Sequence, residues 1–203
     1  MTRVRSFVSA VAVALAVGLV APALGAAGGT IAGTVRAHGQ ASADTVVYIV
    51  HADGSFKRPA KPPVMNQHFK RFIPHVLPVM LGTAVEYHNE DSFKHNVFSP
   101  DYGGFNLGAW GQGATKTHTY STCANVPCAY RQMCLIHPHM LGFVVVLQNP
   151  YFATSGSDGR YTISNVPPGK YTLAVWHEGA LKAVARPMTV ENGKTTTVDF
   201  TLQ

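Results

Sequence analysis

Apolar and β-branched residues recur along this chain in short runs, and no stretch has the three-to-four-residue period of an amphipathic helix. Runs with strand character cover residues 30–36, 45–50, 79–88, 95–98, 115–120, 128–134 and 142–147. Near the C-terminus, Val198, Phe200 and Leu202 alternate with polar residues, the period of two expected of a half-buried strand. Many short strands of this kind predict an all-β chain built as β-sandwiches.

Turn-forming residues separate these runs. Asp158-Gly159 and Asn192-Gly193 lie between β-like segments, and because such dipeptides favour the positive φ angles of tight turns, they predict two hairpins. A stretch rich in proline and lysine, residues 57–63, follows the first two predicted strands. The 19 glycines and 13 prolines are enough for many turns and too few for a collagen-like or wholly disordered chain.

Length and charge narrow the classes of function. The chain has 203 residues, which allows one or two domains. Only 13% of the residues are charged, and the formal net charge of +6 is spread along the chain without a run of Lys and Arg. Nucleic-acid binding is therefore not expected.

The N-terminus has the layout of a signal peptide. Arg3 and Arg5 precede the uncharged stretch 7–21, which is followed by Pro22 and a run rich in small residues. A membrane anchor is the rival interpretation, but the apolar core of about 15 residues is shorter than the roughly 20 that a bilayer requires. We expect cleavage near Gly25, removing residues 1–25, and a mature protein in the periplasm or secreted, with no membrane attachment. Disulfides persist in such a compartment.

Potential metal ligands concentrate in residues 134–140. Cys134, His137 and Met140 fall within seven residues between two predicted strands, and His95 opens an earlier strand. Soft sulfur ligands with two imidazoles suit copper, and two His, one Cys and a distant axial Met form the ligand pattern of blue-copper sites. Residues three apart in an extended strand point to opposite faces, so Cys134 and His137 share a metal only if the chain bends between them. Pro138 biases His137 away from helical dihedral angles.

Each of these residues also has an ordinary structural interpretation. His95 alone fits a surface or hydrogen-bonded residue, Cys134 a small buried hydrophobe, and Met140 a filler of the core. His139 is expected to point outward. The remaining histidines lack close paired spacing and are expected at the surface or in the core: His38, His51, His68, His75, His88, His118 and His177.

The three cysteines leave one thiol over if two of them form a bridge. Cys123 and Cys128 are five residues apart with Pro127 between them, which favours a local disulfide and leaves Cys134 for a metal. In the competing interpretation, Cys123 or Cys128 pairs with Cys134, and the site is a redox disulfide.

Residues 64–150 resemble the cupredoxins, in particular bacterial plastocyanin-like proteins with a Cys-x-x-His-Pro-x-Met loop. The matching motifs are Asn66-Gln67, Phe72-Ile73-Pro74, residues 82–87, Asn89-Glu90-Asp91, residues 95–98, the loop itself and residues 142–146. The resemblance implies one type-1 copper ion with His95, Cys134 and His137 as equatorial ligands and Met140 as the axial ligand. It also implies that Asn96 joins the two ligand loops by hydrogen bonds. Met140 follows His137 by three positions, fewer than in the best-known plastocyanins.

Segments on both sides of this region resemble a second family, the carboxypeptidase regulatory-like, prealbumin-type β-sandwich. Residues 157–163 and 165–173 carry the resemblance, and residues 29–35 resemble its early strand. We therefore expect a copper domain, 56–150, inserted into a smaller discontinuous sandwich, 27–55 and 151–203; two sequential domains are the simpler alternative. Trp176-His177-Glu178 is the most site-like triplet there, with packing and solvation as its ordinary interpretation.

Together the two resemblances imply an electron-transfer protein and no enzyme. It would carry single electrons between transient partners, such as a cytochrome or a dehydrogenase or oxidase, through a small apolar interface around the ligand loop. Copper storage or delivery is the main alternative. A copper oxidoreductase would need an open metal position and more histidines, and an adhesion-like structural module would leave the ligand loop unexplained.

Overall fold

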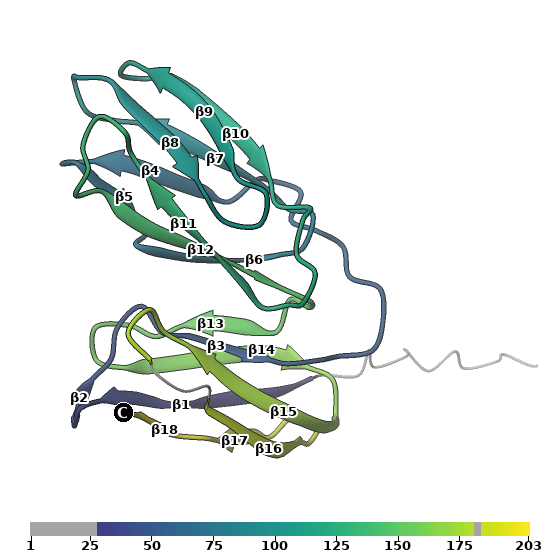
Figure 1. Ribbon diagram of the computed structural model, residues 1–203. Helices are drawn as coiled ribbons and strands as arrows, with labels where there is room; N and C mark the ends of the chain where they lie inside the picture. Colours follow the sequence, from purple (N-terminus) through teal and green to yellow (C-terminus); the bar gives the residue numbers. More distant parts are fainter. Residues whose placement is uncertain (1–27, 181–183) are drawn as a thin grey trace, which may run out of the picture.

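The computed structural model describes residues 28–180 and 184–203, so the expected signal peptide, residues 1–25, lies outside the described residues (Figure 1). The described residues form eighteen β-strands and no helix, which confirms the all-β prediction. No helix in this part of the chain is long and apolar enough to cross a membrane.

The first sandwich is built from residues 64–147 and contains two sheets, ordered β10-β7-β4-β5 and β6-β12-β11-β8-β9. Its strands are β4 (Val64–His68), β5 (Arg71–Ile73), β6 (Val76–Met80), β7 (Ala84–Asn89), β8 (His95–Ser99), β9 (Phe105–Trp110), β10 (Thr115–Thr119), β11 (Cys128–Met133) and β12 (Leu141–Leu147). The core between the sheets includes Met65, Tyr87 and Val144, and it also contains Cys134 and Met140. Two of the expected metal ligands are therefore part of the packed interior.

The second sandwich draws its strands from both ends of the described chain. They are β1 (Gly29–Ala37), β2 (Gln40–Ala41), β3 (Val46–Ile49), β13 (Phe152–Thr154), β14 (Arg160–Val166), β15 (Gly169–Trp176), β16 (Val184–Val190), β17 (Thr195–Thr197) and β18 (Phe200–Leu202). In one sheet β1 pairs with β14, β17 and β18; in the other β3 lies between β13 and β15. Segments that precede and follow the first sandwich in sequence thus share sheets.

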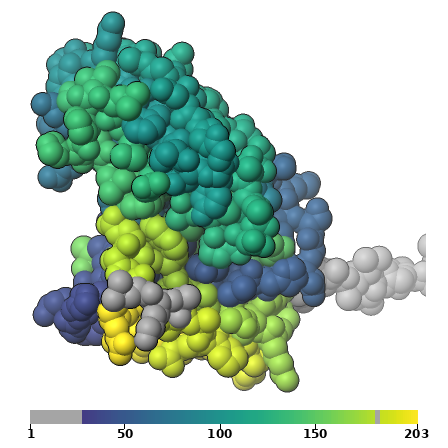
Figure 2. Space-filling view, viewed as in Figure 1, coloured from purple at the N-terminus to yellow at the C-terminus, as the bar shows by residue number. Residues whose placement is uncertain are grey.

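The two sandwiches meet through an apolar cluster, called here the junction cluster. Its buried members are Val46, Tyr48, Val76, Phe143, Val145, Leu147 and Ala174, with Ala129, Phe152 and Trp176 packed against them. In the space-filling view the green atoms of the first sandwich lie directly on the yellow-green atoms of the second (Figure 2). Because Phe143 and Val145 face the junction while Val144 and Val146 face the first core, β12 is buried on both faces. This explains its continuous apolar run, which is typical of strands covered on both sides.

Three sequence expectations about strands were wrong. The run 79–88 is not one strand: β6 ends at Met80 and β7 begins at Ala84, in the other sheet. Gly82 makes this change of sheet possible, because its φ of 80° is one that glycine adopts without strain.

The two expected hairpins are also absent from the described strand pairings. Gly159 and Gly193 do have positive φ angles, 76° and 66°. However, β13 pairs with β3 and β14 with β1, whereas β16 pairs with β15 and β17 with β1. These dipeptides therefore turn the chain between sheets, because a turn's dihedral angles do not decide which strands pair.

Candidate metal centre

Three side chains from two separate segments converge at one end of the first sandwich. His95 is the first residue of β8, Cys134 follows β11, and His137 lies in the loop between β11 and β12. We call residues 134–140 the ligand loop. Pairing of β11 with β8, through Met133 and Phe98, brings this loop beside His95. The required bend between Cys134 and His137 is present, because β11 ends at Met133 and bends follow it.

The donor atoms are spaced as one metal ion would require. The ligand atoms of His95, Cys134 and His137 all lie within 4.8 Å of one another. Nδ1 of His95 is 3.1 Å from Nδ1 of His137, and Sγ of Cys134 is 3.9 Å from Nδ1 of His137. With bonds of about 2.0 Å to nitrogen and about 2.3 Å to sulfur, a shared ion places two nitrogens about 3.2 Å apart and nitrogen and sulfur about 3.6–3.9 Å apart. The residues therefore fit a single ion bound by two imidazoles and a thiolate.

Burial differs among the three donors. His95 and Cys134 are 0% and 3% exposed, whereas His137 is partly exposed at the surface. Desolvation lowers the pKa of His137, and the neighbouring His95 and Lys70 lower this pKa further. A lowered pKa favours the neutral imidazole, which is the form that binds metals. His137 would therefore form the contact between a buried ion and the solvent.

Asp91 orients the buried histidine. Its Oδ2 is 2.8 Å from Nε2 of His95. Burial raises the pKa of Asp91, but the N–H groups of Lys70 and Phe69 and the ring of His95 outweigh that effect, so its pKa is lowered overall. The resulting carboxylate accepts a hydrogen bond from the N–H at Nε2 of His95. This tautomer leaves the lone pair of Nδ1 free and directed at the other donors. Asp91 belongs to the motif Asn89-Glu90-Asp91, but the sequence alone assigned it no role. Its position, four residues before a candidate ligand, is the sequence feature that could have indicated this contact.

Asn96 joins the ligand loop to its supporting strands. Its backbone N–H lies 3.4 Å from Sγ of Cys134, and its Oδ1 accepts the N–H of Leu135 at 3.2 Å. Its Nδ2 donates to Asn106 and Gly108 in β9. These contacts provide the link between loops that the resemblance implies for Asn96.

The other candidate residues take different positions. Met140 is 1% exposed, and its N–H donates to the carbonyl of His137 at 3.0 Å; its role as an axial ligand stays a prediction. His139 is exposed and outside the donor cluster. Within the described residues the other histidines also lie outside this cluster, and all of them are exposed or partly exposed: His38, His51, His68, His75, His88, His118 and His177.

The cysteines are arranged as the local-disulfide interpretation expected. Cys123 and Cys128 form a disulfide with a Cα–Cα distance of 5.9 Å, and Cys134 is a buried free thiol. The competing interpretation, a redox disulfide that includes Cys134, is wrong for this structure.

Exposed apolar side chains lie in the ligand loop and on the segments that contact Asp91, His95 and His137. We call Phe69, Phe93, Leu135 and Ile136 the apolar rim; they are 77%, 40%, 61% and 44% exposed. The ring of Phe93 lies 5.2 Å from the rings of both His95 and His137, and Nζ of Lys70 lies 5.3 Å from the centre of that ring. The surface next to His137 is therefore apolar with a positive charge at its edge.

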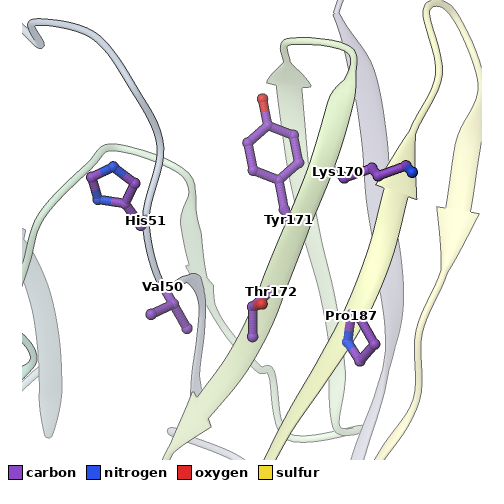
Figure 3. A pocket seen from close by; sticks show the side chains of 6 residues that line it. All are labelled: Val50, His51, Lys170, Tyr171, Thr172 and Pro187. Carbon is purple, nitrogen blue, oxygen red and sulfur yellow. The ribbon is translucent and has the colours of Figure 1, made fainter.

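The second sandwich has a surface pocket whose described lining residues include no cluster of metal-binding side chains. It is lined by Val50, His51, Lys170, Tyr171, Thr172 and Pro187 (Figure 3). The Tyr171 hydroxyl donates to the carbonyl of Pro167, and Nε2 of His51 lies 3.1 Å from Oδ1 of Asp53. These polar groups are bound to neighbours in the chain and do not form a donor set like that of the first sandwich.

Comparison with known proteins gives matches to parts of the chain. Residues 141–203 match the family model of the carboxypeptidase regulatory-like domain. This match confirms the second resemblance, and it begins at β12, which belongs to a sheet of the first sandwich. No curated protein matches the chain.

Similar solved structures include a nitrite reductase, an amicyanin variant and a purple cupredoxin. A copper-containing nitrite reductase from Thermus scotoductus SA-01 has 27% identity and a TM-score of 0.39, covering 48% of this chain and 25% of that protein. A reduced mutant of amicyanin has 22% identity and a TM-score of 0.38, covering 43% and 84%. A purple cupredoxin from Nitrosopumilus maritimus has 25% identity and a TM-score of 0.36, covering 41% and 98%. This chain thus spans a quarter of the length of the nitrite reductase.

Proposed function

We propose that this chain is an exported copper protein that carries single electrons and binds one copper ion through His95, Cys134 and His137. The observation that carries the proposal is the convergence of one cysteine sulfur and two imidazole nitrogens within 4.8 Å. This donor set suits copper and not a hard cation such as calcium. Bound copper supplies a reversible one-electron change between its cuprous and cupric states.

The residues of the chain hold this site in a fixed geometry. Asp91 fixes the tautomer of His95, and Asn96 restrains the Cys134 sulfur and the backbone of Leu135. Met140, buried in the same core as Cys134, would supply the weak axial ligand. Because His95 and Cys134 are buried, water is kept from all but the His137 side. A site restrained in this way changes little when it gains or loses an electron.

Electrons pass through the exposed edge of His137, and the apolar rim forms the docking face. Phe69, Phe93, Leu135 and Ile136 supply a small apolar surface, as expected of short-lived electron-transfer encounters. The partner is a redox protein such as a cytochrome, a dehydrogenase or an oxidase. Lys70 at the edge of the rim favours a partner with negative charge around its own redox centre.

The organisation of the chain agrees with this function. Residues 56–150 form the copper domain, inserted between residues 27–55 and 151–203 of the regulatory-like sandwich; the pairing of β1 and β3 with later strands supports this division. Residues 1–25 direct export to the periplasm or beyond. The disulfide Cys123–Cys128 supports an oxidising compartment.

A copper titration of the purified mature protein tests the proposal. One equivalent of cupric ion should produce an intense sulfur-to-copper charge-transfer band in the visible spectrum, absent in Cys134→Ser, and voltammetry should show a reversible couple. A colourless protein that keeps zinc after copper challenge would contradict it. Copper that binds without a reversible couple and exchanges rapidly would favour storage or delivery.

A further inference from the structure

β12 connects the ligand loop to the second sandwich. It begins at Leu141, directly after Met140, and it pairs with β6 so that Phe143 lies opposite Val76. Phe143 and Val76 both belong to the junction cluster. Phe143, a member of the junction cluster, is therefore only three residues after Met140, the proposed axial ligand.

Two side chains at the end of β15 contact this part of the first sandwich. The ring of Trp176 lies 5.2 Å from the ring of Phe143, and Oε1 of Glu178 lies 2.9 Å from Nε2 of His75. In Figure 1, β15 rises toward the first sandwich on the side of the ligand loop. The two contacted residues are themselves joined, because the carbonyl of His75 accepts the N–H of Phe143 at 2.8 Å and their rings meet edge to face at 5.6 Å.

Gly142, between Phe143 and the ligand loop, packs closely against Phe72 and His75. A Cβ atom on Gly142 would lie 2.8 Å from Cβ of Phe72 and 3.1 Å from the carbonyl of His75. Met140 is buried, and its N–H is bonded to the carbonyl of His137. A surface hollow lined by His75, Met140 and Leu141 borders this segment. Because the packed side of the segment has few voids, we expect a displacement of Phe143 to reach the buried Met140.

We propose that Trp176 and Glu178 are positioning residues for the metal centre: through Phe143 and His75 they fix the start of β12 and thereby the position of Met140. The second sandwich then has a function, which is to set the geometry of a site on its neighbour. This inference rests on the proposed copper site. A weak axial ligand tunes the potential of such a site more than it holds the ion, so the effect should appear in spectra and potential and not in copper content.

The test uses the full mature protein loaded with copper, in the variants Trp176→Ala and Glu178→Ala. Both should keep one equivalent of copper and show a shifted charge-transfer band, altered cupric EPR parameters and a changed reduction potential. Trp176→Phe, which keeps an aromatic ring against Phe143, should restore most of the wild-type values.

Two matched controls remove similar groups away from the ligand loop. Phe152→Ala takes an aromatic side chain from the far end of the junction, where Phe152 lines a pocket with Met80 and Val79. Glu191→Ala removes a carboxylate of the second sandwich that is paired with Lys194. Both controls should have the spectrum and potential of the wild type.

A second readout needs no copper. Cys134 is 3% exposed, so its rate of alkylation, measured on metal-free protein, reports how often the ligand loop opens. We expect this rate to rise several-fold in Trp176→Ala and Glu178→Ala and to stay unchanged in both controls.

The outcomes separate this inference from the copper proposal. Unchanged spectra, potentials and alkylation rates in variants of a wild type that does form the visible band would overturn the positioning role alone. A wild type without the band would overturn the copper site, and the alkylation rates would still decide whether Trp176 and Glu178 fix the loop. If Trp176→Ala does not fold, Glu178→Ala decides, because it removes only an exposed carboxylate.

Discussion

The two sandwiches bury different kinds of side chain. The core of the second consists of aliphatic and aromatic residues, including Ile31, Ile49 and Leu173. The polar side chains buried in the second are the small hydroxyls of Ser42, Thr45 and Ser155, whereas the first buries larger polar groups, among them Gln132 and the candidate ligand His95. A buried polar group contributes little stability unless its hydrogen bonds are complete. The larger polar groups of the first sandwich therefore give its donor atoms accurate positions, whereas the second depends mainly on apolar burial.

Gln132 shows how the polar groups of the first sandwich are satisfied. It is two residues before Cys134, and its Oε1 accepts hydrogen bonds from the hydroxyls of Tyr87 and Tyr120 at 2.8 and 3.0 Å. Its Nε2 donates to the carbonyl of Tyr130. Burial raises the pKa values of Tyr87 and Tyr120, so both hydroxyls keep their protons and remain donors. The strand that ends at Cys134 is thus held by a buried hydrogen-bond network.

Metal removal should separate the two sandwiches most clearly. At a free copper concentration about a thousand times the dissociation constant, binding adds about 4 kcal/mol to the stability of the folded form. That stabilisation should act on the first sandwich, which holds the donors. In Trp176→Phe, the remaining tryptophan, Trp110, reports unfolding of the first sandwich by fluorescence. Addition of a copper chelator should lower the midpoint of this unfolding transition. If β1 and β14 of the second sandwich lose as much hydrogen-exchange protection as the first sandwich does, the two sandwiches unfold as one unit.

Leu173→Ala should have the next largest effect. Leu173 is fully buried in the core of the second sandwich, and truncation of such a side chain costs about 3 kcal/mol. The same change at Leu135, which is 61% exposed in the ligand loop, should alter the free energy of unfolding by less than about 0.5 kcal/mol. Urea denaturation of both variants measures the difference. A similar loss of unfolding free energy in Leu135→Ala and Leu173→Ala would mean that Leu135 is buried in solution.

Gln132→Leu should destabilise the first sandwich by about 2 kcal/mol, because two buried tyrosine hydroxyls lose their shared acceptor. The loss should be smaller when Tyr87→Phe and Tyr120→Phe are already present, since no donor is then left without a partner. Denaturant unfolding of the single, double and triple variants gives the coupling energy. Additive losses would argue that the network has no cooperative role.

Local patterns in the sequence were sufficient for much of this fold. The strands beginning at His95 and Cys128 are close to their predicted bounds, because apolar alternation and β-branching are properties of neighbouring residues. Strands β4 and β9 were not predicted, because polar residues such as Asn66 and Asn106 interrupt their apolar pattern. The pairing of β14 with β1 joins residues more than a hundred positions apart, and no local signal specifies such a pair.

The candidate site follows the same division. The spacing of Cys134, His137 and Met140 indicated a ligand loop, and it required a bend that the structure has. The contact of Asp91 with His95 depends in addition on the turn at Phe69 and Lys70, whose positive φ angles of 51° and 55° direct two N–H groups at the carboxylate. That geometry arises only when β4 and β5 fold back against the segment before β8. Spacing alone therefore identified the donors but not the group that orients them.

The smallest effect that we expect concerns stability at acid pH. It is tested by comparing one carboxylate from each sandwich. Hydrogen bonds from the side chain of Arg131 lower the pKa of Asp101 in the first sandwich, and hydrogen bonds from the side chain and backbone of Thr34 lower the pKa of Asp199 in the second. A carboxylate whose pKa is lower in the folded than in the unfolded state stabilises the protein above the unfolded pKa of about 3.9. This stabilisation is lost as pH falls through the folded pKa.

Each sandwich should therefore lose stability as pH falls below about 4, and each loss should depend on its own aspartate. Asp101 is 18% exposed and bound by Arg131 at 2.7 Å, so Asp101→Asn should cost on the order of 1 kcal/mol at pH 7 and much less at pH 2. Asp199 is exposed, so Asp199→Asn should have a smaller effect, confined to the second sandwich. Acid titrations followed by Trp110 fluorescence in Trp176→Phe, and by hydrogen exchange of β1 and β14, measure the two halves separately. If Asp199→Asn changes the acid transition of the first sandwich as much as Asp101→Asn does, the junction couples the two cores more strongly than their separate packing indicates.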